Sequence, residues 1–288
     1  MAFSTVAVVG VGLIGGSFAL ALRKAGFSGR ILGVSSPPAV RAALEKGVID
    51  EAKPLEEALA EADLVYLAQT IERIKETLKA ADRFLKPGAL VTDAGSTKAE
   101  IAAAGAECIR RGQFLGGHPM AGKETRGVEQ AEADLFAGRT YVLTPLGPQD
   151  LESPAAVELV DWIRRIGARP VFLDPIEHDR IVSWTSHLPQ LASTALAGVV
   201  GKALERSEAV RIAGPGLHDM TRLALSSYEV WRDILATNRQ HVLLALETYI
   251  SELERMRSEL EQSDVEQEFA KGAKFAALLR RKLWGDLA

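Results

Sequence analysis

The chain has 288 residues, of which 47% are hydrophobic and 25% are charged, and its formal net charge at pH 7 is -4. These values predict a globular protein long enough to form two domains, and they exclude an intrinsically disordered chain. They also give no basic surface for nucleic acid, so we expect no nucleic-acid partner.

The single cysteine, Cys108, excludes an intrachain disulfide and a cysteine-rich metal site. This usage suits a reducing compartment, so we expect a cytoplasmic protein without a metal cofactor. No signal peptide is expected, because residues 1–10 lack a basic leader ahead of an apolar core. The longest apolar stretch, Leu188–Val200, contains Pro189 and Gln190 and falls short of the roughly 20 residues of a membrane helix. We predict a buried helix there and no membrane contact.

The N-terminal part alternates predicted strands and helices. The predicted strands, from β-branched and apolar runs, are 5–9, 30–34, 63–68, 89–93, 113–116 and 140–144. The predicted helices, from helical apolar spacing, are 17–25, 37–46, 71–84 and 98–110. This order predicts an α/β fold whose N-terminal domain is a Rossmann-type doubly wound parallel sheet.

The first strand and helix are joined by a glycine-rich turn of the GxGxxG type. Gly10 allows the tight turn, Gly12 lets the backbone approach a pyrophosphate, and Gly15 allows close packing of the helix. The N–H groups at the helix start, with Leu13 and Ile14, would then hold the phosphates. This context predicts dinucleotide binding.

The second predicted strand ends without an acidic side chain. A carboxylate at this place commonly binds the ribose 2′-hydroxyl of NAD. This chain has Ser35 and Ser36 there, and no acidic residue occurs between Arg30 and Glu45. The two serines, with Arg41, would suit a 2′-phosphate. We therefore expect NAD(P) as the cofactor, with NADP favoured at least equally with NAD.

A lone histidine, His118, stands in the glycine-rich stretch Gly116–Gly122 after an apolar run. If the fifth strand ends at Gly116, His118 lies at the carboxyl edge of the parallel sheet, where open α/β folds bind ligands. The alternative is a turn followed by a rigid proline.

Helical patterning replaces the alternation from about Asp174 onward. The predicted helices are 175–184, 188–205, 216–225, 228–260 and 265–283. The expected domains are therefore a dinucleotide-binding domain, residues 1–173, and an all-helical domain, residues 174–288. The long helix carries an apolar stripe that needs a cover, either a partner subunit or another helix of the chain. This stripe comprises Leu243, Leu246, Ile250, Leu253 and Leu260.

Several motifs occur in the order in which one family has them. They are the glycine-rich turn, Val-Thr-Asp-Ala-Gly-Ser-Thr-Lys at 91–98, Gly-Gly-His-Pro-Met-Ala-Gly at 116–122, Ser-His-Leu-Pro at 186–189, Thr221-Arg222, and Trp231-Arg232-Asp233. With them the chain resembles the prephenate/arogenate dehydrogenase family of tyrosine biosynthesis over essentially its whole length. The resemblance implies oxidation at the ring C4 hydroxyl of prephenate or arogenate by NAD or NADP, with loss of the ring carboxylate as CO2. It also implies a homodimer formed through the helical domain.

The resemblance assigns roles near the cofactor. His118 matches the base of the family, because a neutral imidazole can accept the proton of the C4 hydroxyl. Ser96 would hydrogen-bond the same hydroxyl, or alternatively it only caps the helix that follows. Asp93 ends the fourth strand and Gln69 follows the third, where it departs from the family pattern, and both are expected at the cofactor.

The two carboxylates of the substrate call for cations or donors. Arg222 matches the substrate-binding arginine of the family, whose guanidinium can bind a carboxylate through two parallel hydrogen bonds. By the same resemblance His187, Asp179 and Glu124 are expected to bind substrate, although Asp179 is alternatively a charge at a helix N-terminus. Lys123 departs from the family pattern.

Two other classes of protein would share some of these sequence features. A β-hydroxyacid dehydrogenase also joins a Rossmann domain to helices, and its catalytic lysine would here be Lys202. A non-catalytic dinucleotide sensor would have no use for Ser96, His118 and Arg222 together.

Overall fold

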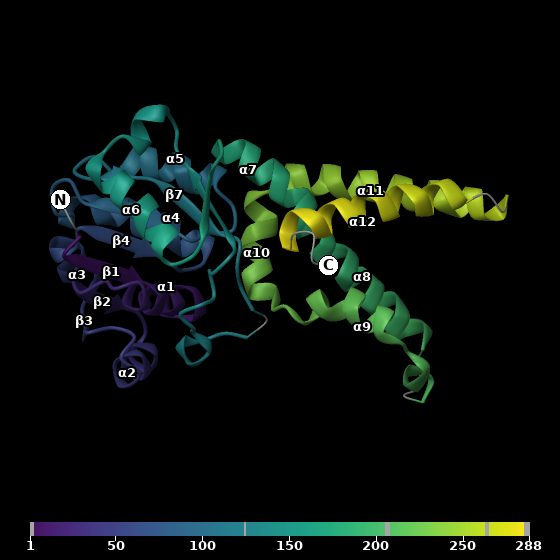
Figure 1. Cartoon of the computed structure of the whole chain (residues 1–288), viewed down its shortest axis with the longest axis horizontal. Coiled ribbons are helices and arrows are strands. Elements are labelled where there is room, and N and C mark those ends of the chain that lie inside the picture. The colour runs from purple at the N-terminus through teal and green to yellow at the C-terminus, as the bar shows by residue number, and fades with distance from the viewer. Residues whose placement is uncertain (1–2, 124, 205–207, 263–264, 285–288) are drawn as a thin grey trace. The chain divides into compact units, whose positions relative to one another are not determined.

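The computed structural model of the chain describes residues 3–123, 125–204, 208–262 and 265–284 (Figure 1). The chain divides into two compact units, residues 1–239 and residues 240–288. Each unit is described by itself below. Among the residues that the structure describes, no helix is both long enough and apolar enough to span a membrane.

The first unit is built on a parallel sheet. Its strands are β1 (Thr5–Val9), β2 (Arg30–Val34), β3 (Glu51–Ala52), β4 (Leu64–Leu67), β5 (Leu90–Asp93) and β6 (Gln113–Phe114). They lie in the order β3-β2-β1-β4-β5-β6, and every neighbouring pair is parallel. This is the strand order of the Rossmann fold, so the predicted fold class is confirmed.

Helices cover both faces of this sheet. They are α1 (Leu13–Lys24), α2 (Pro37–Glu45), α3 (Leu55–Glu61), α4 (Ile71–Ala81), α5 (Ala99–Cys108) and α6 (Pro154–Arg165). Because successive strand residues point to opposite faces, Val6 and Val8 of β1 pack with α1 and α6, whereas Ala7 and Val9 pack with α3, α4 and α5. The sheet is therefore doubly wound.

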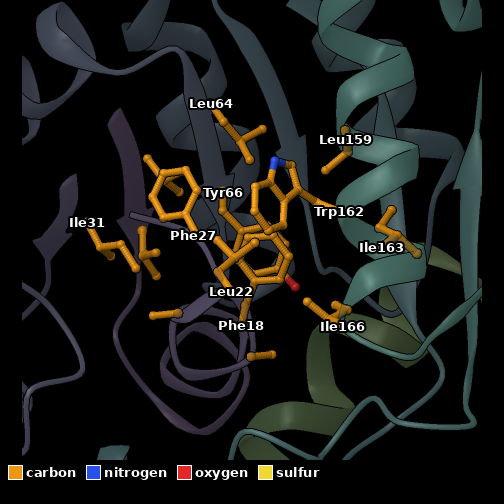
Figure 2. Packing of buried hydrophobic residues seen from close by; sticks show 14 of the residues in the cluster. Phe18, Leu22, Phe27, Ile31, Leu64, Tyr66, Leu159, Trp162, Ile163 and Ile166 are labelled. Atoms are coloured by element: carbon orange, nitrogen blue, oxygen red, sulfur yellow. The ribbon is translucent and has the colours of Figure 1, made fainter. Parts of the chain in front are cut away.

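The core under α1 fixes the helix that begins at the glycine-rich turn. Phe18 of α1 stacks on Tyr66 of β4, with ring centroids 3.9 Å apart. Figure 2 shows Trp162 and Ile163 of α6 in the same cluster. The rings of Phe27 and Trp162 meet edge to face, with centroids 5.4 Å apart. This aromatic packing holds the start of α1 beside the carboxyl ends of β1 and β4.

A second, smaller sheet contains His118. Its strands are β7 (Gly116–Pro119), β8 (Thr140–Thr144) and β9 (Arg169–Phe172). β7 is antiparallel to β8, and β8 is parallel to β9. Two expectations were therefore wrong: the strand at 140–144 does not join the parallel sheet, and the strand expected over 113–116 divides into β6 and β7.

The glycine pair explains why the chain changes sheets here. A Cβ atom on Gly116 would lie 2.3 Å from the Thr144 hydroxyl, and one on Gly117 would lie 2.6 Å from the Asp93 carbonyl oxygen. Only glycines let β7 pass this close to β5 and β8. His118 thus lies within a strand, opposite Val142, and not in a loop after one.

Helices follow β9 within the first unit. They are α7 (Pro175–Val182), the π-helical turn Ser183–His187, α8 (Leu188–Ala203), α9 (Pro215–Thr221) and α10 (Tyr228–Thr237). Short 3-10 turns occur at Asp82–Phe84, Val128–Gln130, Pro148–Leu151, Ala209–Ile212 and Arg222–Leu225. The π-helical turn precedes Pro189, which has no N–H group to continue a regular helix.

Two helix predictions differ from the structure. The helix expected over 228–260 is broken at Asn238, whose side chain donates to the Asp179 carbonyl oxygen at 2.7 Å. The expectation of a buried helix over 188–200 was wrong: α8 buries only Gln190 and Ser193, and Val199 is 65% exposed.

The second unit contains α12 (Glu266–Trp284) and all of α11 (Arg239–Glu261) except its first residue. Arg255 of α11 forms ion pairs with Glu259 of the same helix and with Glu268 of α12. Large apolar side chains remain exposed on both helices, among them Ile250, Leu253, Leu260, Phe269 and Phe275.

Candidate active site

The three glycines of the first turn have separate structural reasons. Gly10 has φ of 97°, and a Cβ atom there would lie 2.5 Å from the Ala68 carbonyl oxygen. A Cβ atom on Gly15 would lie 2.2 Å from the Gly10 carbonyl oxygen. Gly12 differs, because a Cβ atom there would meet no atom within 4 Å. Gly10 and Gly15 are required by packing, whereas the space at Gly12 is open.

The start of α1 fits the pyrophosphate of a dinucleotide. Gly12 is the N-cap residue, and no side chain caps the helix. The N–H groups of the first turn, from Leu13 and Ile14 onward, therefore have no intrahelical acceptors and carry the positive end of the helix dipole. These residues would hold the phosphates in the open space beside Gly12.

The residues at the ends of β2 and β4 lie on either side of this turn. Ser35 and Ser36 are exposed, and Ser36 precedes α2 without capping it through its side chain. Arg41 of α2 is also exposed. Gln69 follows β4 next to Gly10, and its side-chain oxygen accepts from the Thr77 hydroxyl at 2.9 Å.

His118 belongs to a chain of three side chains. Its Nδ1 lies 2.8 Å from Nε2 of His178, and His178 Nδ1 lies 2.8 Å from Oδ1 of Asp179. His178 and Asp179 are buried, whereas His118 is partly exposed. Burial holds the pKa of His118 well below its usual range, and His178, Lys98 and His187 lower it further. His118 is therefore neutral at neutral pH.

Asp179 also caps α5. Its carboxylate accepts the backbone N–H groups of Lys98 at 2.7 Å and Ala99 at 2.9 Å. Within the described residues the Ser96 side chain makes no capping bond to α5, so capping does not account for this serine. The Asp179 carboxylate is used by donors of the protein, which leaves it little capacity to bind substrate directly.

A buried ion pair joins the parallel sheet to β7. Asp93 and Lys98 are both fully buried and form a short ion pair. Asp93 also accepts the N–H groups of Gly95 at 2.7 Å and Gly117 at 3.1 Å, and Lys98 Nζ donates to the Gly117 carbonyl oxygen at 2.8 Å. Burial lowers the pKa of Lys98, while Asp93 opposes that shift. The Asp93 carboxylate thus positions Gly117.

His187 ends the π-helical turn and meets a second polar group. Its Nδ1 lies 3.2 Å from Nδ2 of Asn238, the residue that breaks the helix after α10. Its ring and that of Trp231 of α10 meet edge to face, with centroids 5.7 Å apart. Burial lowers the pKa of His187 to about 4, although the charge of Asp179 opposes this shift. His187 is therefore a neutral imidazole.

Arg222 and Lys123 belong to other segments of the chain. Arg222 is exposed in the 3-10 turn Arg222–Leu225, which Gln190 of α8 ties down by donating to the Leu223 carbonyl oxygen at 2.8 Å. Lys123 forms an ion pair with Glu132 at 2.7 Å. Glu124 lies outside the described residues. Among the residues that are described, no group of three or more side chains could hold a metal ion.

Three residues of this site were not predicted as site residues. His178 adjoins Asp179 in the sequence, and Lys98 ends the Asp-Ala-Gly-Ser-Thr-Lys stretch, so neighbouring residues could have marked both as site residues. No neighbouring residue marks Asn238 in this way, because it lies inside a predicted helix.

Fold and site together define the class of protein, a Rossmann-type dehydrogenase that uses a nicotinamide dinucleotide. Comparison with known proteins identifies the family. Residues 18–171 match the model of the prephenate dehydrogenase nucleotide-binding domain, and residues 174–275 match the model of the prephenate dehydrogenase dimerization domain. The chain belongs to the prephenate dehydrogenase family.

Individual relatives agree with this assignment. Prephenate dehydrogenase of Bacillus subtilis (strain 168) is 36% identical over 270 residues, which cover 92% of this chain and 72% of the relative. A crystal structure of Aquifex aeolicus prephenate dehydrogenase with hydroxyphenyl propionate and NAD+ has a TM-score of 0.85 at 30% identity and covers 98% of this chain and 99% of that one. Synechocystis arogenate dehydrogenase has a TM-score of 0.77 at 30% identity, with 96% and 99% covered.

The two other classes are not favoured. Similarity to a 3-hydroxyisobutyrate dehydrogenase of Mycobacterium tuberculosis, at 14% identity and a TM-score of 0.54, shows the fold alone. Lys202, the lysine that a β-hydroxyacid dehydrogenase would need, is exposed in the last turn of α8. Membership of an enzyme family likewise argues against a non-catalytic sensor.

Proposed function

We propose that this chain catalyses the NAD(P)-dependent oxidative decarboxylation of prephenate or arogenate, with His118 as the base. The observation that carries the proposal is the family match over both parts of the chain. The products would be 4-hydroxyphenylpyruvate from prephenate and tyrosine from arogenate.

The reaction removes a proton, a hydride and a carboxylate from the ring. The C4 hydroxyl gives its proton to His118, while C4 gives up a hydride, which the nicotinamide ring accepts when the cofactor is bound. The bond to the ring carboxylate breaks, CO2 leaves, and the electron pair completes the aromatic ring. The oxygen then takes a proton back to give the phenol. Aromatisation drives the loss of CO2, so no strong acid is needed.

Three properties of His118 support its role as the base. The residue is neutral because burial depresses its pKa, and a base must be unprotonated to act. It is partly exposed, so a substrate hydroxyl can reach the ring. Its neighbour Gly117 is bonded to Asp93 at the carboxyl end of β5, the edge of the sheet where the dinucleotide turn also lies. Ser96, which follows β5 on the same edge, would orient the hydroxyl.

His187 and Arg222 would bind the carboxylates of the substrate. Asn238 donates to Nδ1 of His187 and thereby leaves the proton of the neutral ring on Nε2, as a donor for a carboxylate. Arg222 would bind the other carboxylate through two parallel hydrogen bonds. Glu124 is assigned to substrate binding by family resemblance alone. Asp179 would act on substrate only through the side chains that it holds.

The cofactor would be NADP at least as readily as NAD. Gly10, Gly12 and Gly15 with Leu13 and Ile14 would hold the pyrophosphate, and Gln69 would lie near the nicotinamide side of the turn. Exposed Ser35 and Ser36 at the end of β2 would accept a 2′-phosphate, since α2 has no acidic residue in its first turn to repel it.

We also propose that the two parts of the chain have different functions. Residues 1–173 would bind the dinucleotide, and residues 174–288 would supply substrate and dimer contacts. The apolar side chains exposed on α11 and α12 support a homodimer, because a partner subunit would cover them. The second family model is described as a dimerization domain. As a biosynthetic enzyme with one cysteine and no disulfide, the protein would work in the cytoplasm.

Steady-state kinetics of His118→Asn with both substrates and both cofactors test the proposal. We expect kcat to fall by roughly 10² to 10⁴, the usual contribution of a general base, with cofactor affinity nearly unchanged. His218→Asn is the matched control, because His218 is exposed on α9. A kcat for His118→Asn within about threefold of the unsubstituted enzyme would remove His118 from the mechanism.

A further inference from the structure

The hydrogen bonds around His118 determine where its proton lies. The Asp179 carboxylate has only acceptor atoms, and it already receives two backbone N–H groups at the start of α5. Its contact with His178 Nδ1 at 2.8 Å therefore requires a proton on that nitrogen. A neutral His178 then has no proton on Nε2, which becomes an acceptor.

The next bond in the chain follows from this. His178 Nε2 lies 2.8 Å from His118 Nδ1, and the two rings meet edge to face, with centroids 5.1 Å apart and planes at 69°. Since His178 Nε2 is the acceptor, His118 Nδ1 must carry the proton. The lone pair of His118 then lies on Nε2, the nitrogen that faces away from His178.

We infer that His178, oriented by Asp179, is a positioning residue that makes Nε2 of His118 the atom that accepts the substrate proton. The inference rests on the proposed role of His118 as the base. His178 is fully buried, so it acts through His118 and not on the substrate. In histidine sites generally, the hydrogen bond made by one ring nitrogen sets the protonation of the other.

Charged and titratable groups from several elements face the two rings. The groups that face them are Asp179 beside His178, the Asp93–Lys98 ion pair behind Gly117, and His187. Burial, His178, Lys98 and His187 all hold the pKa of His118 low, so its ring is neutral before the reaction.

Two substitutions separate positioning from packing. His178→Phe fills the buried space but cannot accept a hydrogen bond, whereas His178→Gln can accept from His118 through its amide oxygen and donate to Asp179 through its amide nitrogen. We expect the phenylalanine variant to lose at least about 10² in kcat, since loss of a group that fixes the tautomer of a catalytic histidine costs up to about 10⁴ in a serine protease. We expect the glutamine variant to stay within about tenfold of the unsubstituted enzyme. KM and cofactor affinity should change little in either.

A merely structural role predicts the opposite order, because phenylalanine packs better than glutamine in a buried position. If the phenylalanine variant is the more active of the two, or keeps more than about half of kcat, the inference is wrong. His218→Phe serves as the control for a histidine outside the network.

Nitrogen-15 spectra of the unsubstituted enzyme give a readout that does not depend on activity. The chain has five histidines, so the signals of a histidine-labelled sample can be assigned by single substitutions. At about pH 8, above the ordinary pKa of histidine, we expect His118 to carry its proton on Nδ1 and the His178→Phe variant to lose this preference. A proton found on Nε2 of His118 would overturn the inference. Unchanged kcat in His118→Asn would instead refute the proposed base, whatever tautomer the spectra show.

Discussion

The buried ion pair between Asp93 and Lys98 makes a quantitative prediction about stability. Lys98→Met keeps the aliphatic bulk of the side chain but removes the charge. Asp93 would then keep the N–H groups of Gly95 and Gly117 and have no counter-charge. Breaking a buried pair by removing one partner costs about 3 to 5 kcal/mol. We therefore expect the free energy of unfolding to fall by that amount, a large part of the 5 to 15 kcal/mol typical of a folded domain.

Urea unfolding at fixed protein concentration measures this loss, and a double-mutant cycle isolates its cause. The double variant Asp93→Asn, Lys98→Met removes both charges of this pair, so it should be more stable than Lys98→Met alone by at least about 1 kcal/mol. Lys75→Met is the matched control. Lys75 pairs with Glu72 and Glu100 at the surface of α4 and α5, and its loss should cost at most about 1 kcal/mol. If Lys98→Met were no more destabilising than Lys75→Met, the reasoning would be refuted.

Three further predictions concern the substrate, the cofactor and pH. Arg222→Gln should lower kcat/KM at least tenfold, mostly through a higher KM, because breaking an arginine–carboxylate pair costs about 2 to 5 kcal/mol. Arg222→Lys should recover only part of this loss, because lysine lacks the planar guanidinium group. Unchanged kinetics of Arg222→Gln in folded protein would mean that another cation binds the carboxylate. Ser35→Asp should shift the NAD/NADP ratio of kcat/KM strongly toward NAD, since a carboxylate binds the ribose hydroxyl and repels a 2′-phosphate. An unchanged ratio would mean that Ser35 is not the position that discriminates between NAD and NADP. The pKa of His187, about 4 when folded and 6.5 when unfolded, gives stability that is complete above pH 6.5 and lost as pH falls toward 4. Between pH 7 and pH 5 this residue should account for a loss of about 2 kcal/mol in urea unfolding, and His187→Gln should remove that part of the pH dependence.

Local sequence patterns predicted many of the strands and helices well, but they did not predict which strands pair in the same sheet. The bounds of the strands Thr5–Val9, Arg30–Val34 and Thr140–Thr144 follow from runs of apolar and β-branched residues. Which sheet the last of these joins depends on β7, and β7 depends on the packing of two glycines against Thr144 and Asp93. Such contacts join residues far apart in the chain. No element was predicted over 154–172, where α6 and β9 lie.

The site shows the same division between local and distant information. His118 and Ser96 were predicted as site residues because family motifs mark them. The break at Asn238 depends on a bond to the backbone of residue 179, and no periodicity inside a helix reports it. Asp179 was expected at the substrate or at the start of its own helix. Its carboxylate also caps another helix, through a contact that spans 81 residues to Lys98.

The cap that Asp179 makes on α5 has a counterpart on α4, and both caps affect how the protein folds. Asp179 accepts N–H groups at the start of α5, and Asp233 of α10 lies 3.4 Å from the Glu72 N–H at the start of α4. Two helices of the dinucleotide fold thus take their N-terminal caps from chain that follows residue 173. Cooperative unfolding should therefore extend across that position, in line with a first compact unit that runs to residue 239. A fragment ending at residue 173 would lose both caps and also His178. Truncation at this position would therefore remove the residues that orient the base together with the caps that stabilise the helices of the sheet.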